Sequence, residues 1–139
     1  MEQHDAVLEA NAAFYRAFES LDLTRMEDVW LRAASITCVH PGWRLLVGWG
    51  PVMASWQRIF ANTVSLRFSI TDVHVDAVGE IAWVVCTENL ESAQHDQTVS
   101  AQIQATNMFQ RKGGRWWLMH HHASPISPPG AEAEPEHMH

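Results

Sequence analysis

Lysine is almost absent from this 139-residue sequence. Lys112 is the single lysine, and the net charge is −7 because sixteen acidic residues outnumber nine basic ones. A nucleic-acid-binding protein needs a basic patch to neutralise phosphates. The nearest cluster of cations, Arg111, Lys112 and Arg115, surrounds Gly113-Gly114, where a solvated hairpin tip is expected. The composition therefore argues against binding to nucleic acid.

Cysteines and long apolar runs are also scarce. Cys38 and Cys86 each lie in an apolar, strand-like run, so we expect two buried, reduced thiols rather than a disulfide. No run of about 18 apolar residues occurs, so no transmembrane helix is expected. The first five residues are polar and acidic, unlike the basic start of a secretory signal. We therefore expect a cytoplasmic protein that does not associate with membranes.

The overall balance is that of one globular domain. Hydrophobic residues make up 47% of the chain and charged residues 18%, which is enough apolar material for a real core. Residues 127–139 are rich in proline and glutamate, so we expect them to form a disordered tail. The prediction is a single domain over residues 1–126.

Apolar spacing predicts three helices in the first sixty residues. Steps of three and four residues predict a helix over 5–21, with the inward residues Val7, Ala10, Phe14, Phe18 and Leu21. Asp22 is a suitable N-cap for a second, short helix that carries Met26, Val29 and Trp30. A short strand over 35–39 ends at His40-Pro41-Gly42, and Gly50-Pro51 opens the third helix.

From residue 64 onward the apolar period changes from 3.6 to 2, which predicts strands. The apolar phase flips near Thr71-Asp72, and a β-bulge there would restore every side chain to its face and bend the strand. Further strands are expected over 81–92, 99–110 and 116–124. The predicted fold is α+β: three N-terminal helices packed on a strongly curved, mainly antiparallel sheet, cone-shaped and barrel-like.

A turn at Gly113-Gly114 would fix the register of the last hairpin. It pairs Asn107 with His120, Phe109 with Leu118 and Ala105 with His122, all on the concave face. Apolar walls with a few convergent polar groups are typical of small-molecule sites. The expected pocket combines Asn107 and His120 with Phe14, Phe18, Trp30, Trp43, Trp56, Ile103, Phe109, Leu118 and His122.

Three residues are candidates for catalysis. His40 ends the first strand at the expected rim of the pocket, and neutral histidine is the commonest general base. Asn107 offers an amide donor to a developing oxyanion, and His120 a proton relay. The alternatives are that His40 caps the strand end through backbone bonds and that Asn107 is a satisfied buried amide.

Metal and cofactor sites are not expected. His120 and His122 share a strand face in the predicted register, and His40 could join them. A metal site usually needs three or four convergent donors, and Glu88 is the only acid in mid-strand that could help. The chain also has no nucleophile motif and no phosphate-binding loop.

Three segments resemble the nuclear transport factor 2-like superfamily, and most closely its SnoaL-like branch. They are Val39-His40-Pro41-Gly42-Trp43, Gly48-Trp49-Gly50 and the closing segment 115–125, within a resemblance that covers about residues 5 to 126. Ketosteroid isomerase relatives have a catalytic aspartate before a proline, and the matching residue is His40. Their oxyanion donors match Phe14 and Asn107. Tyr15 is turned about 100° from Phe14 around the helix, so we expect one donor to be lost.

The sequence leaves two hypotheses for function. The first is a small-molecule-binding domain that catalyses proton transfer on an apolar carbonyl compound, by isomerisation, cyclisation or dehydration. The second is a non-catalytic module for ligand sensing or homo-oligomerisation. Met108, Trp117 and Met119 would form an apolar patch on the convex face, and the resemblance also implies a homodimer packed through that face.

Overall fold

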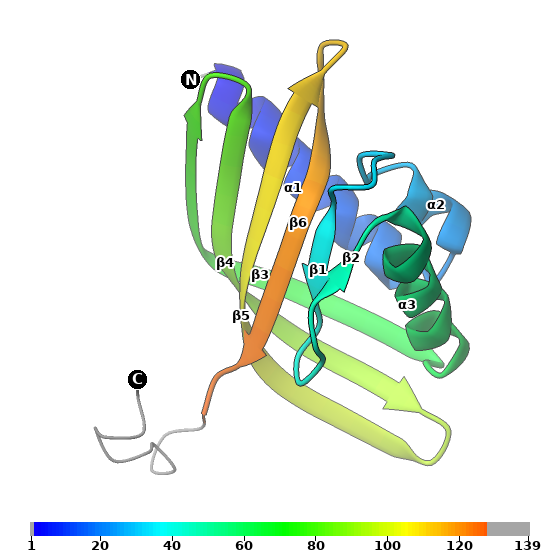
Figure 1. Cartoon of the computed structure of the whole chain (residues 1–139). Coiled ribbons are helices and arrows are strands. Elements are labelled where there is room, and N and C mark those ends of the chain that lie inside the picture. Colours follow the sequence, from blue (N-terminus) through cyan, green and yellow to red (C-terminus); the bar gives the residue numbers. More distant parts are fainter. Residues whose placement is uncertain (1, 128–139) are drawn as a thin grey trace, which may run out of the picture.

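A computed structural model describes residues 2–127 of the chain. Three helices precede most of one six-stranded sheet, whose strand order is β2-β1-β6-β5-β4-β3 (Figure 1). The elements are α1 (Glu2–Ser20), α2 (Leu23–Glu27), β1 (Thr37–Val39), β2 (Leu46–Val47), α3 (Trp49–Ala61), β3 (Ser65–Val78), β4 (Ile81–Gln94), β5 (Gln97–Lys112) and β6 (Arg115–Pro125). This order confirms the predicted α+β class. The predicted tail lies outside the described residues, apart from residue 127.

The three predicted helices form, with two corrections to their bounds. α2 ends at Glu27, so Trp30 lies beyond it and bridges to Leu118, and α3 begins at Trp49, so Pro51 is not its first residue. Asp22 is the N-cap of α2, and its carboxylate accepts a hydrogen bond of 2.9 Å from the backbone N–H of Thr24. The inward face of α1 is wider than the predicted stripe, because Asn11 and Tyr15 are buried beside Val7 and Phe14. Two polar side chains of α1 therefore enter the interior. No helix within residues 2–127 is long and apolar enough to cross a membrane.

The sheet is strongly curved but open. β3, β4, β5 and β6 form an antiparallel meander, and β1 joins β6 in parallel. The β3–β4 register shifts between Thr71 and His74, and Asp72 has a φ of 52°, so the predicted bulge is confirmed. The first half of β3, the second half of β4 and the first half of β5 lie side by side and bend away beneath α3 (Figure 1). Because β2 and β3 remain edge strands, the sheet curls around the core without closing into a barrel.

A second bulge, in β6, makes the predicted register of the last hairpin wrong beyond its first four residue pairs, Lys112/Arg115 to Phe109/Leu118. Phe109 pairs with Leu118 as predicted, but the register then shifts between Met108 and Phe109. Asn107 lies opposite His121 rather than His120, and Ala105 lies opposite Ala123 rather than His122. β6 thus carries one extra residue between Leu118 and His121, which reverses the inward and outward alternation of every later residue.

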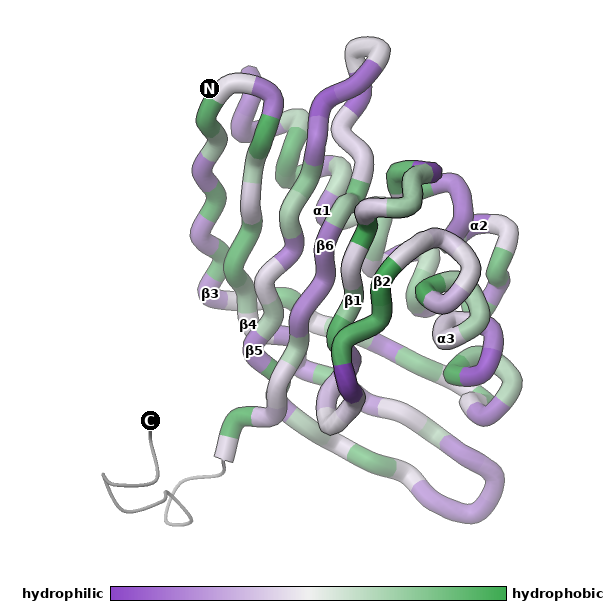
Figure 2. Tube along the Cα trace, viewed as in Figure 1, coloured by the Kyte–Doolittle hydropathy of each residue, from purple (hydrophilic) through white to green (hydrophobic). Residues whose placement is uncertain are grey.

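The core lies between the helices and the inner face of the sheet. Its largest side chains with almost no exposure include Trp30, Trp56, Phe14 and Phe109. Apolar and polar residues alternate along much of the sheet, as expected for strands with one covered face (Figure 2). Helix α1 packs along β3 and also contacts β4 and β6, so it roofs the polar residues described next.

Candidate functional site

Five polar side chains form one connected group in the otherwise apolar interior. Asn107 of β5 donates to Asn11 Oδ1 at 2.9 Å and to the hydroxyl of Tyr15 at 3.1 Å. Tyr15 donates in turn to Glu88 Oε2 at 2.6 Å. His121 Nδ1 lies 2.6 Å from Asn107 Oδ1. We call Asn11, Tyr15, Glu88, Asn107 and His121 the inner network; all five are at most 4% exposed.

The hydrogen-bond pattern fixes the tautomer of His121. The amide group of Asn107 uses both of its N–H donors on Asn11 and Tyr15, so its oxygen must accept from His121. His121 therefore carries its proton on Nδ1 and a lone pair on Nε2. Complete burial lowers the pKa of His121 well below its usual value, with smaller contributions from His40 and the neighbouring histidines. The imidazole is therefore neutral at physiological pH.

Glu88 is the most unusual ionisable group of the network. Burial raises the pKa of its carboxyl from 4.5 to about 7, although the hydrogen bond from Tyr15 partly opposes this shift. The pKa of Tyr15 is raised well above 10.0, first by burial and then by the charge of Glu88. Glu88 thus titrates near neutral pH beside a phenol that keeps its proton. Carboxyl groups with this property are typical general acids or bases.

His40 lies close to this network, but it is not at an open rim. It is 2% exposed, and its Nε2 is 2.8 Å from Ser55 Oγ. The Ser55 hydroxyl gives its only proton to the carbonyl of Val52 at 2.6 Å, so it accepts from His40. His40 is therefore protonated on Nε2, with its lone pair on Nδ1. Burial lowers its pKa to about 4, so it is neutral at physiological pH.

Aromatic rings fill the space around the two buried histidines. The ring of Trp56 is 4.7 Å from His40 and 5.9 Å from His121, and Phe14 is 5.0 Å from His121. The predicted lining residues Phe14, Trp30, Trp56, Ile103, Phe109 and Leu118 are buried, Phe18 and Trp43 are half-buried, and His122 is exposed. The residues predicted to line the pocket inside the sheet are therefore largely core.

A surface hollow in the described part of the chain lies elsewhere. It has a volume of about 780 Å³ and is lined by residues 67–69 of β3, 89–91 of β4, 100–102 of β5 and residues 125 and 126. A second cavity of about 320 Å³ lies between α2 and the β5–β6 hairpin. Neither contains a residue of the inner network in its wall. Phe68 lines the larger hollow and also packs its ring 5.1 Å from Tyr15.

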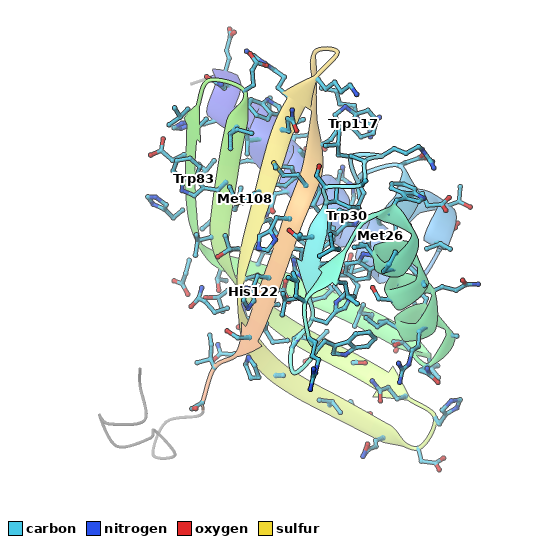
Figure 3. All side chains as sticks on the ribbon, viewed as in Figure 1. Met26, Trp30, Trp83, Met108, Trp117 and His122 are labelled. Atoms are coloured by element: carbon cyan, nitrogen blue, oxygen red, sulfur yellow. The ribbon has the colours of Figure 1, made fainter. Side chains whose placement is uncertain are left out.

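The bulge separates His120 and His122 from Asn107. His120 is half-buried and its Nδ1 lies 2.7 Å from Thr37 Oγ1, while the ring of His122 is 6.1 Å from that of His120. Figure 3 shows His122 with Trp83 and Met108 on the face of the sheet away from α1. Residues 2–127 contain no group of three or more histidine, cysteine or acidic side chains placed to hold a metal ion.

Sequence analysis missed most of the inner network. Tyr15 was expected to turn away from Asn107, but α1 is rotated so that its phenol reaches both Asn107 and Glu88. Regular alternation from His120 and His122 on the concave face would place His121 on the outer face, and the bulge in β6 turns it inward instead. Glu88 carried one usable signal, since a lone acid in the middle of an apolar strand is uncommon.

Comparison with known proteins identifies the family. The SnoaL-like domain family matches residues 7–128, which is most of the chain. The chain belongs to the SnoaL-like domain family. A solved structure from Streptomyces avermitilis, described as a candidate dehydratase of the NTF2-like family, is 40% identical. It aligns with a TM-score of 0.86 over 91% of this chain and 98% of its own.

Other relatives of this SnoaL-like domain carry different descriptions. A candidate calcium/calmodulin-dependent protein kinase type II association domain from Thiobacillus denitrificans is 33% identical, with a TM-score of 0.76 over 85% of this chain and 93% of its own. The F-box protein SKIP8 of Arabidopsis thaliana is 27% identical over 86% of this chain. The chain spans about half the length of that curated relative.

Proposed function

We propose that this SnoaL-like domain is a general acid–base enzyme acting on a small, largely apolar carbonyl compound, most simply a dehydratase or isomerase. The observation that carries the proposal is the buried Tyr15–Glu88 pair, whose carboxyl has a pKa of about 7 and is joined through Tyr15 to Asn107 and His121. Burying ionisable groups costs stability, so such a cluster favours a role beyond folding. The resemblance to a candidate dehydratase supports the same chemistry.

The proposed chemistry is the loss of water from a β-hydroxy carbonyl compound. His40 Nδ1, which holds a lone pair, takes the proton on the carbon next to the carbonyl. The phenol of Tyr15 turns its proton from Glu88 to the departing hydroxyl, which leaves as water, and it takes the proton of the neutral Glu88 carboxyl in return, so that Glu88 ends as a carboxylate. The C–H electron pair becomes the new carbon–carbon double bond, so atoms and charge balance. Asn107 and His121 hold the phenol in position.

Of the residues predicted for catalysis, His40 keeps its role as the base in the proposal. Asn107 does not act as an oxyanion donor, because its two N–H groups are used on Asn11 and Tyr15, and it positions Tyr15 instead. His120 does not keep its role, because its ring lies on the other face of the sheet and bonds to Thr37. Substrate entry requires the aromatic side chains around His40 and Tyr15 to move, since both residues are nearly fully buried. Phe68, which separates Tyr15 from the larger hollow, is the side chain we expect to swing.

A titration that needs no substrate tests the acid directly. In protein labelled with ¹³C at the glutamate carboxyls, the Glu88 resonance should titrate near pH 7, and Glu88→Gln should remove that resonance. A panel of aromatic β-hydroxy ketones, followed by the absorbance of the conjugated product, then tests turnover. Glu88→Gln and His40→Asn should each lower kcat by about 10²–10⁴-fold. A Glu88 pKa near 4.5 would refute the proposal. So would a kcat in both variants equal to that of the original protein.

A second candidate function is assembly through the outer face of the sheet. The filled interior favours it, as does the likeness to a kinase association domain. Trp83 pairs with Met108, and Met108 with His120, in one row across three strands of that face. The partner in this proposal is a second copy of the chain, bound through Met108, Trp117 and Met119 with Trp83 alongside.

A further inference from the structure

We propose that Ser55 of α3 is a positioning residue for His40: its hydroxyl oxygen keeps the imidazole proton on Nε2 and so leaves the lone pair on Nδ1, where the proposed reaction needs it. This inference rests on the proposed function, because it concerns the base of that reaction. Ser55 touches no reacting atom in the proposed mechanism. Its part is to decide which nitrogen of His40 is the base and to hold that nitrogen in place.

Two hydrogen bonds place the serine hydroxyl between the imidazole and the backbone of the helix. Ser55 Oγ lies 2.6 Å from the carbonyl oxygen of Val52, three residues earlier in α3, and 2.8 Å from His40 Nε2. A carbonyl can only accept, so the hydroxyl proton is committed to Val52 and the hydroxyl oxygen is left to accept from Nε2. The backbone of α3 thus sets the direction of a hydrogen bond to a histidine fifteen residues away in the chain.

The other neighbours of His40 do not fix its tautomer. Cys38 Sγ lies 3.6 Å from Nε2 and 4.0 Å from Nδ1, so it is within reach of both nitrogens and close to neither. Burial raises the pKa of the Cys38 thiol to about 12, so the thiol stays neutral and is a weak partner. The rings of Trp43 and Trp56 pack 4.9 and 4.7 Å from the imidazole, which restrains the ring plane but not the position of the proton.

The Ser55 bond also supports His40 once it has taken a proton. Protonation at Nδ1 makes the imidazole a cation, and a hydrogen bond from a charged donor is stronger than one from a neutral donor. Ser55 Oγ, already bonded to Nε2, accepts this stronger bond. His40 needs such an acceptor, because burial lowers its pKa to about 4. His40 and Ser55 are 2% and 4% exposed, so the bond lies in an interior where a lost partner is costly.

Tautomer and turnover together test the role of Ser55. Spectra of protein with ¹⁵N-labelled histidine distinguish a protonated from an unprotonated ring nitrogen, and His40→Asn identifies the His40 resonances. The original protein should show a protonated Nε2 and an unprotonated Nδ1. In Ser55→Ala, the ratio of the Nε2–H to the Nδ1–H tautomer should fall about ten-fold. On the panel of β-hydroxy ketones, kcat should fall about 10- to 100-fold with KM little changed. Ser55→Thr keeps the hydroxyl and should restore most of both.

Ser20→Ala is the matched control. Ser20 makes the same kind of bond within its helix, from its hydroxyl to the carbonyl of Ala17 at 2.6 Å. Its oxygen accepts from the backbone N–H of Asp22 rather than from a histidine. The control should therefore leave the His40 tautomer and kcat unchanged. If Ser55→Ala does not fold, Ser55→Cys takes its place, because a thiol is the weaker acceptor and should move both readouts in the same direction.

The outcomes separate the role of Ser55 from the proposed function. If Glu88 titrates near pH 4.5, the proposed function fails, and the tautomer ratio in Ser55→Ala still decides whether Ser55 positions His40. The role of Ser55 is overturned if Ser55→Ala leaves the ¹⁵N resonances of His40 unchanged. It is also overturned if Ser55→Ala has the kcat of the original protein while His40→Asn lowers it.

Discussion

The phenol of Tyr15 on α1 donates a 2.6 Å hydrogen bond to Glu88 in the middle of β4, seventy-three residues away in the chain. This contact joins the first helix to the centre of the sheet and brings an acid with a pKa of about 7 into the core. The same hydroxyl accepts a hydrogen bond from Asn107, whose oxygen binds His121. The phenol of Tyr15 thus links two buried titratable groups: the Glu88 carboxyl directly, and the His121 imidazole through Asn107.

Replacing Glu88 with glutamine should change how stability depends on pH. Between about pH 4.5 and 7 the folded chain holds a proton on Glu88 that the unfolded chain has released. Glu88 therefore lowers the free energy of unfolding as pH rises through this window, by about 3 kcal/mol for a pKa difference of this size. In denaturant unfolding from pH 4 to 8, the free energy of unfolding of the original protein minus that of Glu88→Gln should fall by about this amount as pH rises, which separates Glu88 from the opposite effect of His40. A difference that does not change with pH would mean that Glu88 titrates normally.

Replacing His40 with asparagine should remove a pH dependence of opposite sign. The pKa of His40 is lowered from 6.5 to about 4 in the folded chain. Between about pH 4 and 6.5, His40 is therefore protonated in the unfolded chain and neutral in the folded chain. Stability contributed by neutral His40 is thus lost as pH falls, again by about 3 kcal/mol in full. In the same unfolding series, His40→Asn should be less sensitive to acid than the original protein. Greater sensitivity to acid would contradict the assignment.

The bulge in β6 predicts which of two adjacent histidines matters for folding. His121→Ala removes a buried ring and leaves Asn107 Oδ1 without its donor, so it should lower the free energy of unfolding by about 3 kcal/mol. His120→Ala, whose ring is half-buried and bonds only to Thr37, should cost about 1 kcal/mol or less. Chemical unfolding of the two variants at pH 7.5 measures the difference. The regular register without a bulge requires the opposite ranking.

A charged side chain in the centre of the outer sheet face should prevent the proposed self-association. Met108→Glu places a carboxylate in the row formed by Trp83, Met108 and His120. Sedimentation velocity should show a dimer for the original protein and a monomer for the variant, because burying an unpaired charge costs several kcal/mol. Val64→Glu, at an exposed site before β3, is the control and should remain a dimer. A monomeric original protein would exclude this surface as a homodimer interface.

The sequence by itself determined the helices-then-strands order, the start of α2 at Asp22 and the bulge near Thr71, but it missed the short strand β2 and placed the start of α3 at Gly50-Pro51 rather than at Trp49. Each of the correctly predicted features depends on the spacing of nearby residues or on a hydrogen bond made by one residue to its own neighbours. Such short-range features can be predicted from the sequence. The sequence also indicated the family, since the segments around His40 and residues 115–125 resemble its pattern. Only the family comparison turned that resemblance into membership.

Only the tertiary structure decided which polar residues meet in the interior. The extra residue between Leu118 and His121 changes the face of a side chain at no cost to the apolar pattern, because Leu118 and Ala123 remain buried on either side of it. The rotation of α1 that buries Tyr15 with Phe14 depends on packing against β3 and β4, from residues fifty or more positions away. Contacts of that range are set by how whole elements pack, and local spacing does not encode them.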